Sequence, residues 1–143
     1  MNTTYLQEKM TGNLRDQQVA FQAAESVIHD AEQFIDNIAT TGSFDGSNGL
    51  LGQTDAEPDY LDDATWSTTN SIAYSATLPE VSDTPRYIIK HIGEIESPSP
   101  SLGMPKYGTR KIGDTSLFRI TVRGSGSTPA ARVIIQSHYG KVL

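Results

Sequence analysis

The sequence contains no cysteine. This absence excludes disulfide scaffolds, thiolate zinc sites and thiol catalysis together. It leaves the redox compartment open, because an exported protein can also lack cysteine. Basic residues are scarce as well: 11 Lys and Arg stand against 17 Asp and Glu, which gives a net charge of −6 and a pI of about 4.9. Such an acidic chain has no general electrostatic attraction for nucleic acids or anionic membranes.

Long apolar runs are also missing. No stretch of about 18 apolar residues occurs, so no membrane span is predicted within the sequence, and the polar N-terminus does not read as a signal peptide. Whether Met1 is the native start is left open. The composition is that of a globular chain, with 36% hydrophobic and 20% charged residues among 143. That length fits one domain with a real core.

Residues 14–38 carry the clearest pattern, and no glycine or proline interrupts it. Apolar residues recur every seven positions in three adjacent rows, which together form one stripe at helical period. We predict a helix over residues 4–38, about 50 Å long. A helix of that length overhangs the remaining globule, and an exposed helical end needs a partner to be stable. The residues expected to pack on the rest of the chain are Leu14, Phe21, Ala24, Ile28, Ala31, Ile35 and Ile38.

The segment after the helix is read as mostly loop, then strands. Gly42 is the expected C-terminal cap of the helix, and residues 43–63 read as a loop. Strands are predicted from Ser71 to Leu78 and from Arg86 to Ile95, and an excursion loop rich in Pro, Ser and Gly from Ser97 to Gly113. Trp66, the only tryptophan, is expected to anchor in the core.

The strongest β pattern lies at the end of the chain. Leu117–Arg123 and Ala131–Tyr139 alternate apolar and polar residues, and residues 124–129 join them, so a hairpin is predicted. The arginines of the hairpin, among them Arg119, are expected on its solvent side. The residues expected in the hairpin core are Phe118, Ile120, Val122, Val133 and Ile135.

These elements predict an α+β fold, in which the long amphipathic helix packs on an antiparallel sheet of three to four strands. Residues 1–42 form the helical part and residues 43–143 the globular head, and the two make one structural domain. Ala24 and Ala31 allow the sheet to approach the helix closely.

Two groups of residues have the chemistry of metal ligands. Glu25, His29 and Glu32 share one helix face, but a bundle-type site needs ligands from a second helix, which is not predicted. An oxygen-rich loop offers a weak calcium site, although its spacing does not match an EF-hand. Solvated polar surface is the plainer interpretation of both groups, so no metal or cofactor is assigned. The calcium candidates are Asp45, Asn48, Asp55 and Asp59.

Nothing in the sequence indicates an enzyme. His91 and His138 lie on predicted strands without a nucleophile motif, and there is no Gly-x-Ser-x-Gly. Gly124 and Gly126 have the spacing of the first two glycines of a dinucleotide loop, but Pro129 stands where such a loop needs its third glycine. No catalytic residue and no small-molecule substrate is predicted.

Two stretches resemble a known family. Asn13-Leu-Arg-Asp16 and Ala20-Phe-Gln-Ala-Ala-Glu25, with Gln7-Glu-Lys-Met10 upstream, are similar to the helix signature of the PilX family of type IV pilus minor pilins. Phe118-Arg-Ile-Thr-Val-Arg-Gly124 and Val133-Ile-Ile-Gln-Ser-His-Tyr139 are similar to its closing hairpin. The residues between 43 and 85 match nothing in that family that can be quoted.

The resemblance implies a non-enzymatic pilin whose full-length form sits in the inner membrane, facing the periplasm, and later in the pilus fibre. Such a protein primes or supports assembly with other minor pilins, the major pilin and a tip adhesin. The chain looks like the soluble half of such a pilin, and this fragment is expected to be monomeric. The C-terminal disulfide loop of many pilins is absent. By resemblance, the assembly face of the helix carries Asn13, Arg15, Asp16, Gln22 and Glu25.

Two alternatives remain open at this point. One is a periplasmic binding or adaptor module that stands alone. The other is a pseudopilin of type II secretion, which shares the fold.

Overall fold

The computed structural model describes residues 2–76, 78, 81–95 and 115–142. A helix α1 (Asn2–Asn37) is followed by strand β1 (Leu50–Leu51), a short 3-10 helix (Asp63–Trp66), and strands β2 (Ile72–Ala73), β3 (Arg86–Ile95), β4 (Thr115–Ser125) and β5 (Arg132–Val142). The predicted excursion loop from Ser97 to Gly113 lies outside the described residues.

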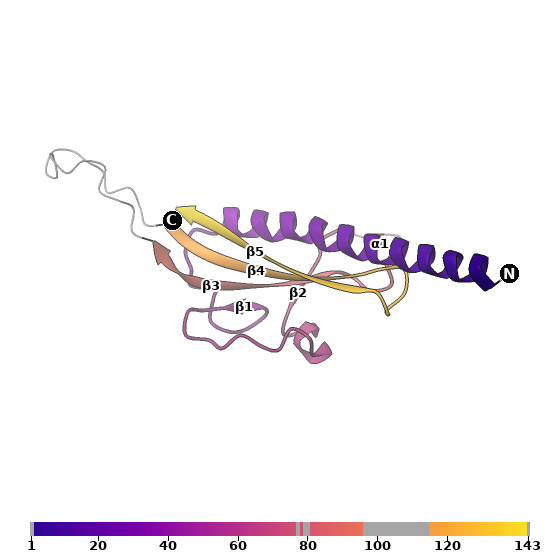
Figure 1. Ribbon diagram of the computed structural model, residues 1–143. Helices are drawn as coiled ribbons and strands as arrows, with labels where there is room; N and C mark the ends of the chain where they lie inside the picture. Colours follow the sequence, from indigo (N-terminus) through magenta and orange to yellow (C-terminus); the bar gives the residue numbers. More distant parts are fainter. Residues whose placement is uncertain (1, 77, 79–80, 96–114, 143) are drawn as a thin grey trace, which may run out of the picture.

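Helix α1 is a single 36-residue rod, about 54 Å long at 1.5 Å per residue. It lies along one face of the sheet and extends beyond it at its N-terminal end (Figure 1). Residues 6–15, here called the overhang, are all exposed, and Asp16 is the first partly buried residue that follows them. The length and the overhang agree with the sequence-based prediction.

The sheet has five strands and is mixed, in the order β1-β3-β4-β5, with β2 paired beside β1 on the same side of β3. The prediction of three to four antiparallel strands is therefore short by one or two, and one pair is parallel: Leu50 and Leu51 of β1 align with Ile89 and Lys90. Strand β3 has the predicted bounds, whereas among the described residues of the predicted strand Ser71–Leu78, Ile72 and Ala73 pair with it. Two-residue strands are defined by a distant partner rather than by local alternation, so the sequence does not reveal them.

The core lies between α1 and the helix-facing side of the sheet. Tyr87 and Ile89 of β3 align with Val122 and Ile120 of β4, and β5 presents Ile135 and Tyr139 on the same side. Phe44 and Leu50, from the loop after the helix, close one end of this core. Burial raises the pKa of the Tyr87 hydroxyl to about 12. The hairpin-core residues Phe118, Ile120 and Val122 are fully buried, and Val133 and Ile135 are partly buried.

The opposite face of the sheet is covered as well, by the segment between β1 and β2 and its 3-10 helix (Figure 1). Trp66 is buried there, and its indole N–H donates to the carbonyl of Tyr60 at 2.8 Å. The Asp62 carboxylate caps the 3-10 helix by accepting from the Ala64 N–H. The protein therefore has three layers, and Trp66 anchors the third rather than the core under the helix.

The C-terminal end of α1 is capped from the hairpin. Gly42, the expected cap, has no positive φ; the glycines with positive φ in the described residues are Gly46 and Gly49. Instead, the Lys141 ammonium donates to the carbonyls of Ile35 (3.1 Å), Asp36 and Ile38 (3.0 Å). The last turn of α1 has no basic residue of its own. A cation from β5 thus supplies the charge that favours a helix C-terminus.

Lys141→Met should lower the free energy of unfolding by about 2 kcal/mol, because bonds from a charged donor are lost while the apolar stem is kept. Urea unfolding followed by circular dichroism measures the change. Lys9→Met, on the exposed overhang, is the matched control and should change stability by less than about 0.5 kcal/mol. Equal effects of the two variants would contradict the capping role.

Candidate assembly surface

Helix α1 has two apolar surfaces, and only one of them packs on the sheet. The buried surface consists of small and medium side chains, with Val27 and Ile35 as its largest fully buried members. Of the residues predicted to pack, Ala24, Ala31 and Ile35 are buried, and Ile28 and Ile38 are partly buried. Leu14 and Phe21 are instead 60% and 46% exposed. The sheet meets the row of Ala20, Ala24, Val27 and Ala31, because small residues allow the closest approach to β4.

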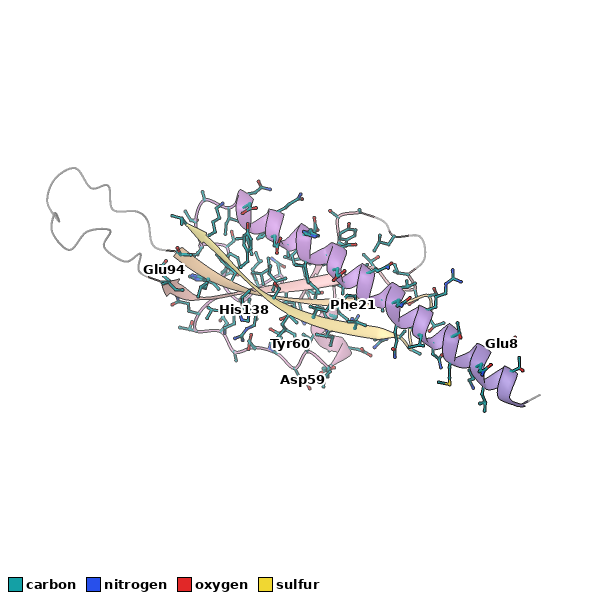
Figure 2. The ribbon with its side chains drawn as sticks, turned by 45° about the horizontal axis from the view of Figure 1, so that its top comes forward. Glu8, Phe21, Asp59, Tyr60, Glu94 and His138 are labelled. Atoms are coloured by element: carbon teal, nitrogen blue, oxygen red, sulfur yellow. The ribbon has the colours of Figure 1, made fainter. Side chains whose placement is uncertain are left out.

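The exposed surface runs along one side of the helix. Leu6 and Met10 are 55% and 63% exposed, and with Leu14 and Phe21 they recur at spacings of four, four and seven residues. These spacings place them on one side of a helix. Figure 2 shows Phe21 where α1 crosses the hairpin, and Glu8 on the overhang beyond it. We call Leu6, Met10, Leu14 and Phe21 the exposed stripe.

The exposed stripe leads into a groove between α1 and the start of β5. Its volume is about 540 Å³. The helix side consists of Leu14 and Phe21 with three glutamines, and the hairpin side consists of residues 130–133. Sequence reasoning missed this groove, since it depends on a contact between segments more than 100 residues apart. The glutamines are Gln17, Gln18 and Gln22.

The residues of the expected assembly face do not share one role. Asn13, Arg15 and Glu25 are exposed, and Gln22 lines the groove. Asp16 is different, because its carboxylate accepts from the Thr128 hydroxyl at 2.5 Å and from the Thr128 N–H at 3.3 Å. Asp16 therefore ties the helix to the tip of the hairpin. The Thr128 hydroxyl bond lowers the pKa of the Asp16 carboxyl below its ordinary value.

The pKa of the Asp16 carboxyl is lower in the folded state than in the unfolded state, so the Asp16–Thr128 contact stabilises the fold above about pH 4. This stabilisation is lost as the pH falls through the folded-state pKa. Asp16→Asn should therefore flatten the fall of the melting temperature between about pH 5 and pH 2. Thr128→Ala should flatten it only in part, because the backbone N–H groups of Ser127 and Thr128 still bond the Asp16 carboxylate, and the double variant should match Asp16→Asn. Additive effects of the two substitutions on the pH profile would show that the residues act separately.

A cluster of charges holds the outer layer on the sheet. Arg119 pairs with Glu57 at 2.7 Å, and Asp63 pairs with Arg123 at 3.2 Å and with Arg132 at 2.5 Å. The Arg123 guanidinium also lies 5.4 Å from the centre of the Trp66 ring. The arginines predicted on the solvent side are thus partly covered. In a chain without cysteine, these ion pairs and the cation–π contact are noncovalent links between the loop and the hairpin.

The weak calcium candidates are engaged in turns. Asp45 accepts from Ser47, Asp55 from the Gly52 N–H at 2.8 Å, and Asp59 from the Leu61 N–H at 3.0 Å. Asn48 has a positive φ of 56°. Within the described ranges, no group of three His, Cys, Asp or Glu side chains is arranged to hold a metal.

The remaining polar candidates are separate from one another. His29 lies 3.7 Å from Glu32 on an exposed face of the helix. His91 is buried on the helix-facing side of the sheet, beside Phe44 and Phe118, whereas His138 lies on the other side, where Arg119 donates to it. The two histidines therefore cannot act on one substrate.

The sequence matches two protein families. Residues 39–141 match the family described as "Type IV pilus assembly protein PilX C-term", and residues 1–28 match the family described as "PilX N-terminal". No curated protein and no solved structure matches the chain significantly. In the described residues, no helix is both long enough and apolar enough to cross a membrane. The two family matches span nearly the whole sequence, and the chain belongs to the PilX family of type IV pilus assembly proteins.

Proposed function

We propose that this PilX-family protein is a minor pilin: a non-enzymatic subunit that primes or supports filament assembly by binding other minor pilins, the major pilin and a tip adhesin. We place it at the periplasmic side of the inner membrane before assembly and in the pilus fibre afterwards. The observation that supports this role best is the exposed stripe. Four large apolar side chains lie exposed on a helix of which residues 6–15 are all exposed.

This exposed helical end is only marginally stable in an isolated subunit. A polar helix end extending into water is marginal by itself, and apolar side chains aligned on it favour packing against another helix. The buried and exposed surfaces of α1 have different compositions: the surface on the sheet consists mainly of alanine with Val27 and Ile35, whereas leucine, methionine and phenylalanine side chains are exposed on the other. These exposed side chains are available to a neighbouring subunit.

Chromosomal deletion in the native host tests this role. The mutant should show fewer surface pili and reduced pilus-driven motility, and the unaltered gene supplied in trans should restore both. Normal piliation and motility in the mutant would overturn the proposal. Normal pili together with a loss of protein secretion would instead indicate a pseudopilin of type II secretion.

A further inference from the structure

The outer edge of β5 is long and regular. Its 11 residues pair with β4 without a register shift, from Thr115↔Val142 to Ser125↔Arg132. In the described part of the chain, β5 has no other strand beside it. Natural edge strands are commonly blunted by proline, a bulge or an inward-facing charge. Strand β5 has no proline and no bulge, and its two charged residues lie at its ends, where Arg132 pairs with Asp63 and Lys141 is engaged at the end of α1.

The ladder identifies which backbone groups face the open edge. The Gly126 N–H donates to the Ala131 carbonyl at 2.8 Å, so this facing pair is hydrogen-bonded. Hydrogen-bonded and non-hydrogen-bonded pairs alternate along an antiparallel ladder. Val133, Ile135 and Ser137 therefore bond to β4, and the residues between them direct their N–H and C=O groups outward. These outward residues are Arg132, Ile134, Gln136, His138 and Gly140.

Helix α1 carries apolar surface beside the same edge. Leu14 and Phe21 are largely exposed, and they line the groove whose other wall is the start of β5. A strand added to β5 would enter that groove where it pairs with the first residues of β5, with its inward side chains beneath Leu14 and Phe21. The amides of Gln17 and Gln22 line the same groove and can bond a polypeptide backbone.

We propose that the free edge of β5 accepts an extended strand from another pilus subunit, which pairs with the outward backbone groups and carries small or aliphatic side chains at alternate positions facing α1. The mode is strand addition beneath a helix, in which main-chain bonds supply affinity and the groove supplies specificity. This inference rests on the proposed function, since it names a contact of the same assembly subunit.

A second copy of this chain fits the edge poorly. Antiparallel pairing of two β5 strands would place two copies of α1 on the same face and point them in opposite directions, which a shared filament axis does not allow. The helix also carries far more acidic than basic side chains, so two copies side by side would repel each other. The charged residues of α1 are Glu8, Asp16, Glu25, Asp30, Glu32 and Asp36 against Lys9 and Arg15.

Amide hydrogen exchange tests whether the outward amides of β5 become paired. It is measured on the chain alone and on the chain purified with co-expressed pilus subunits. In the isolated chain, the amides of Ile134, Gln136 and His138 should exchange at least about tenfold faster than those of Val133 and Ile135. In the complex they should become as slow as their neighbours. Outward amides that still exchange fast in the complex would overturn the proposal. Slow outward amides in a dimer of the isolated chain would also overturn it, in favour of a second copy.

Two matched variants distinguish a loss of binding at the β5 edge from a general loss of stability. Gln136→Pro removes one outward N–H and leaves the bonds to β4 in place, whereas Gln136→Ala removes only the side chain and its 3.2 Å bond to Thr121. The proline variant should weaken capture of the subunits by about tenfold, and the alanine variant should not. Phe21→Gln changes the groove without touching the sheet and should weaken capture similarly.

Equal capture by all three variants would rule the edge out as the contact. A chain that captures no pilus subunit at all would instead contradict the proposed function. The two failures are therefore distinguishable.

Discussion

Replacing Gly124 by alanine should lower the free energy of unfolding by about 3 kcal/mol, the upper end of the usual cost of overpacking. A Cβ at this position would lie 2.7 Å from the backbone nitrogen of Ala24 and still closer to the carbonyl oxygen of Ala20. Both atoms belong to the backbone of α1 and cannot rotate away. The helix would have to move off β4, which would uncover the alanine row that packs there.

Gly12→Ala is the matched control for this substitution. Nothing lies within 4 Å of a Cβ built at Gly12, which sits on the exposed overhang. Alanine there should leave stability unchanged or raise it by at most about 1 kcal/mol, because it has the better helix propensity. Chemical denaturation of both variants provides the comparison. If Gly124→Ala were as stable as the unaltered chain, the close approach of α1 to β4 would be wrong.

Phe118→Ala should cost about 3–5 kcal/mol, the range for deleting a buried aromatic side chain. Phe118 is 0% exposed and lies in the middle of β4. Its ring centre is 5.2 Å from that of Phe44 and 5.2 Å from that of His91. The truncation would leave a cavity beneath the helix and remove the contact that holds the loop after α1. Since a domain of this size is stable by only about 5–15 kcal/mol, the variant should unfold at a much lower denaturant concentration.

Leu61→Ala is the control for the cavity effect. Leu61 is 86% exposed, and its truncation should change stability by less than about 0.5 kcal/mol. A Phe118→Ala variant that loses no more stability than Leu61→Ala would show that Phe118 is not central to the core.

The sequence predicts the parts of the fold that depend on local pattern. The helix, the strand Arg86–Ile95 and the terminal hairpin follow from periodicity and from the turn residues 124–129. The features that the sequence does not predict depend on contacts between residues that lie far apart in it. The two residues of β1 pair with Ile89 and Lys90, and the covering of Arg119 and Arg123 depends on Glu57 and Asp63.

The candidate surface could be predicted only in part, for a related reason. Periodicity shows that α1 carries a wide apolar stripe, but it does not say which side of that stripe meets the chain's own sheet. Because the small residues Ala20 and Ala24 approach β4 most closely, Leu14 and Phe21 are turned away from it. The apolar residues of α1 are thus divided between the internal core and the exposed surface. The orientation in which the helix packs on the sheet decides which residues are buried and which are exposed.

The most direct test of the central claim is complementation of the deletion mutant by a chain altered only in the exposed stripe. Leu6→Gln combined with Met10→Gln removes apolar surface from the overhang, far from the core and outside the groove. This variant should keep the melting temperature of the unaltered chain but fail to restore pili, whereas Glu8→Gln, on the opposite side of the helix, should restore them. Full piliation with the stripe variant would contradict the assignment of this surface to pilus assembly.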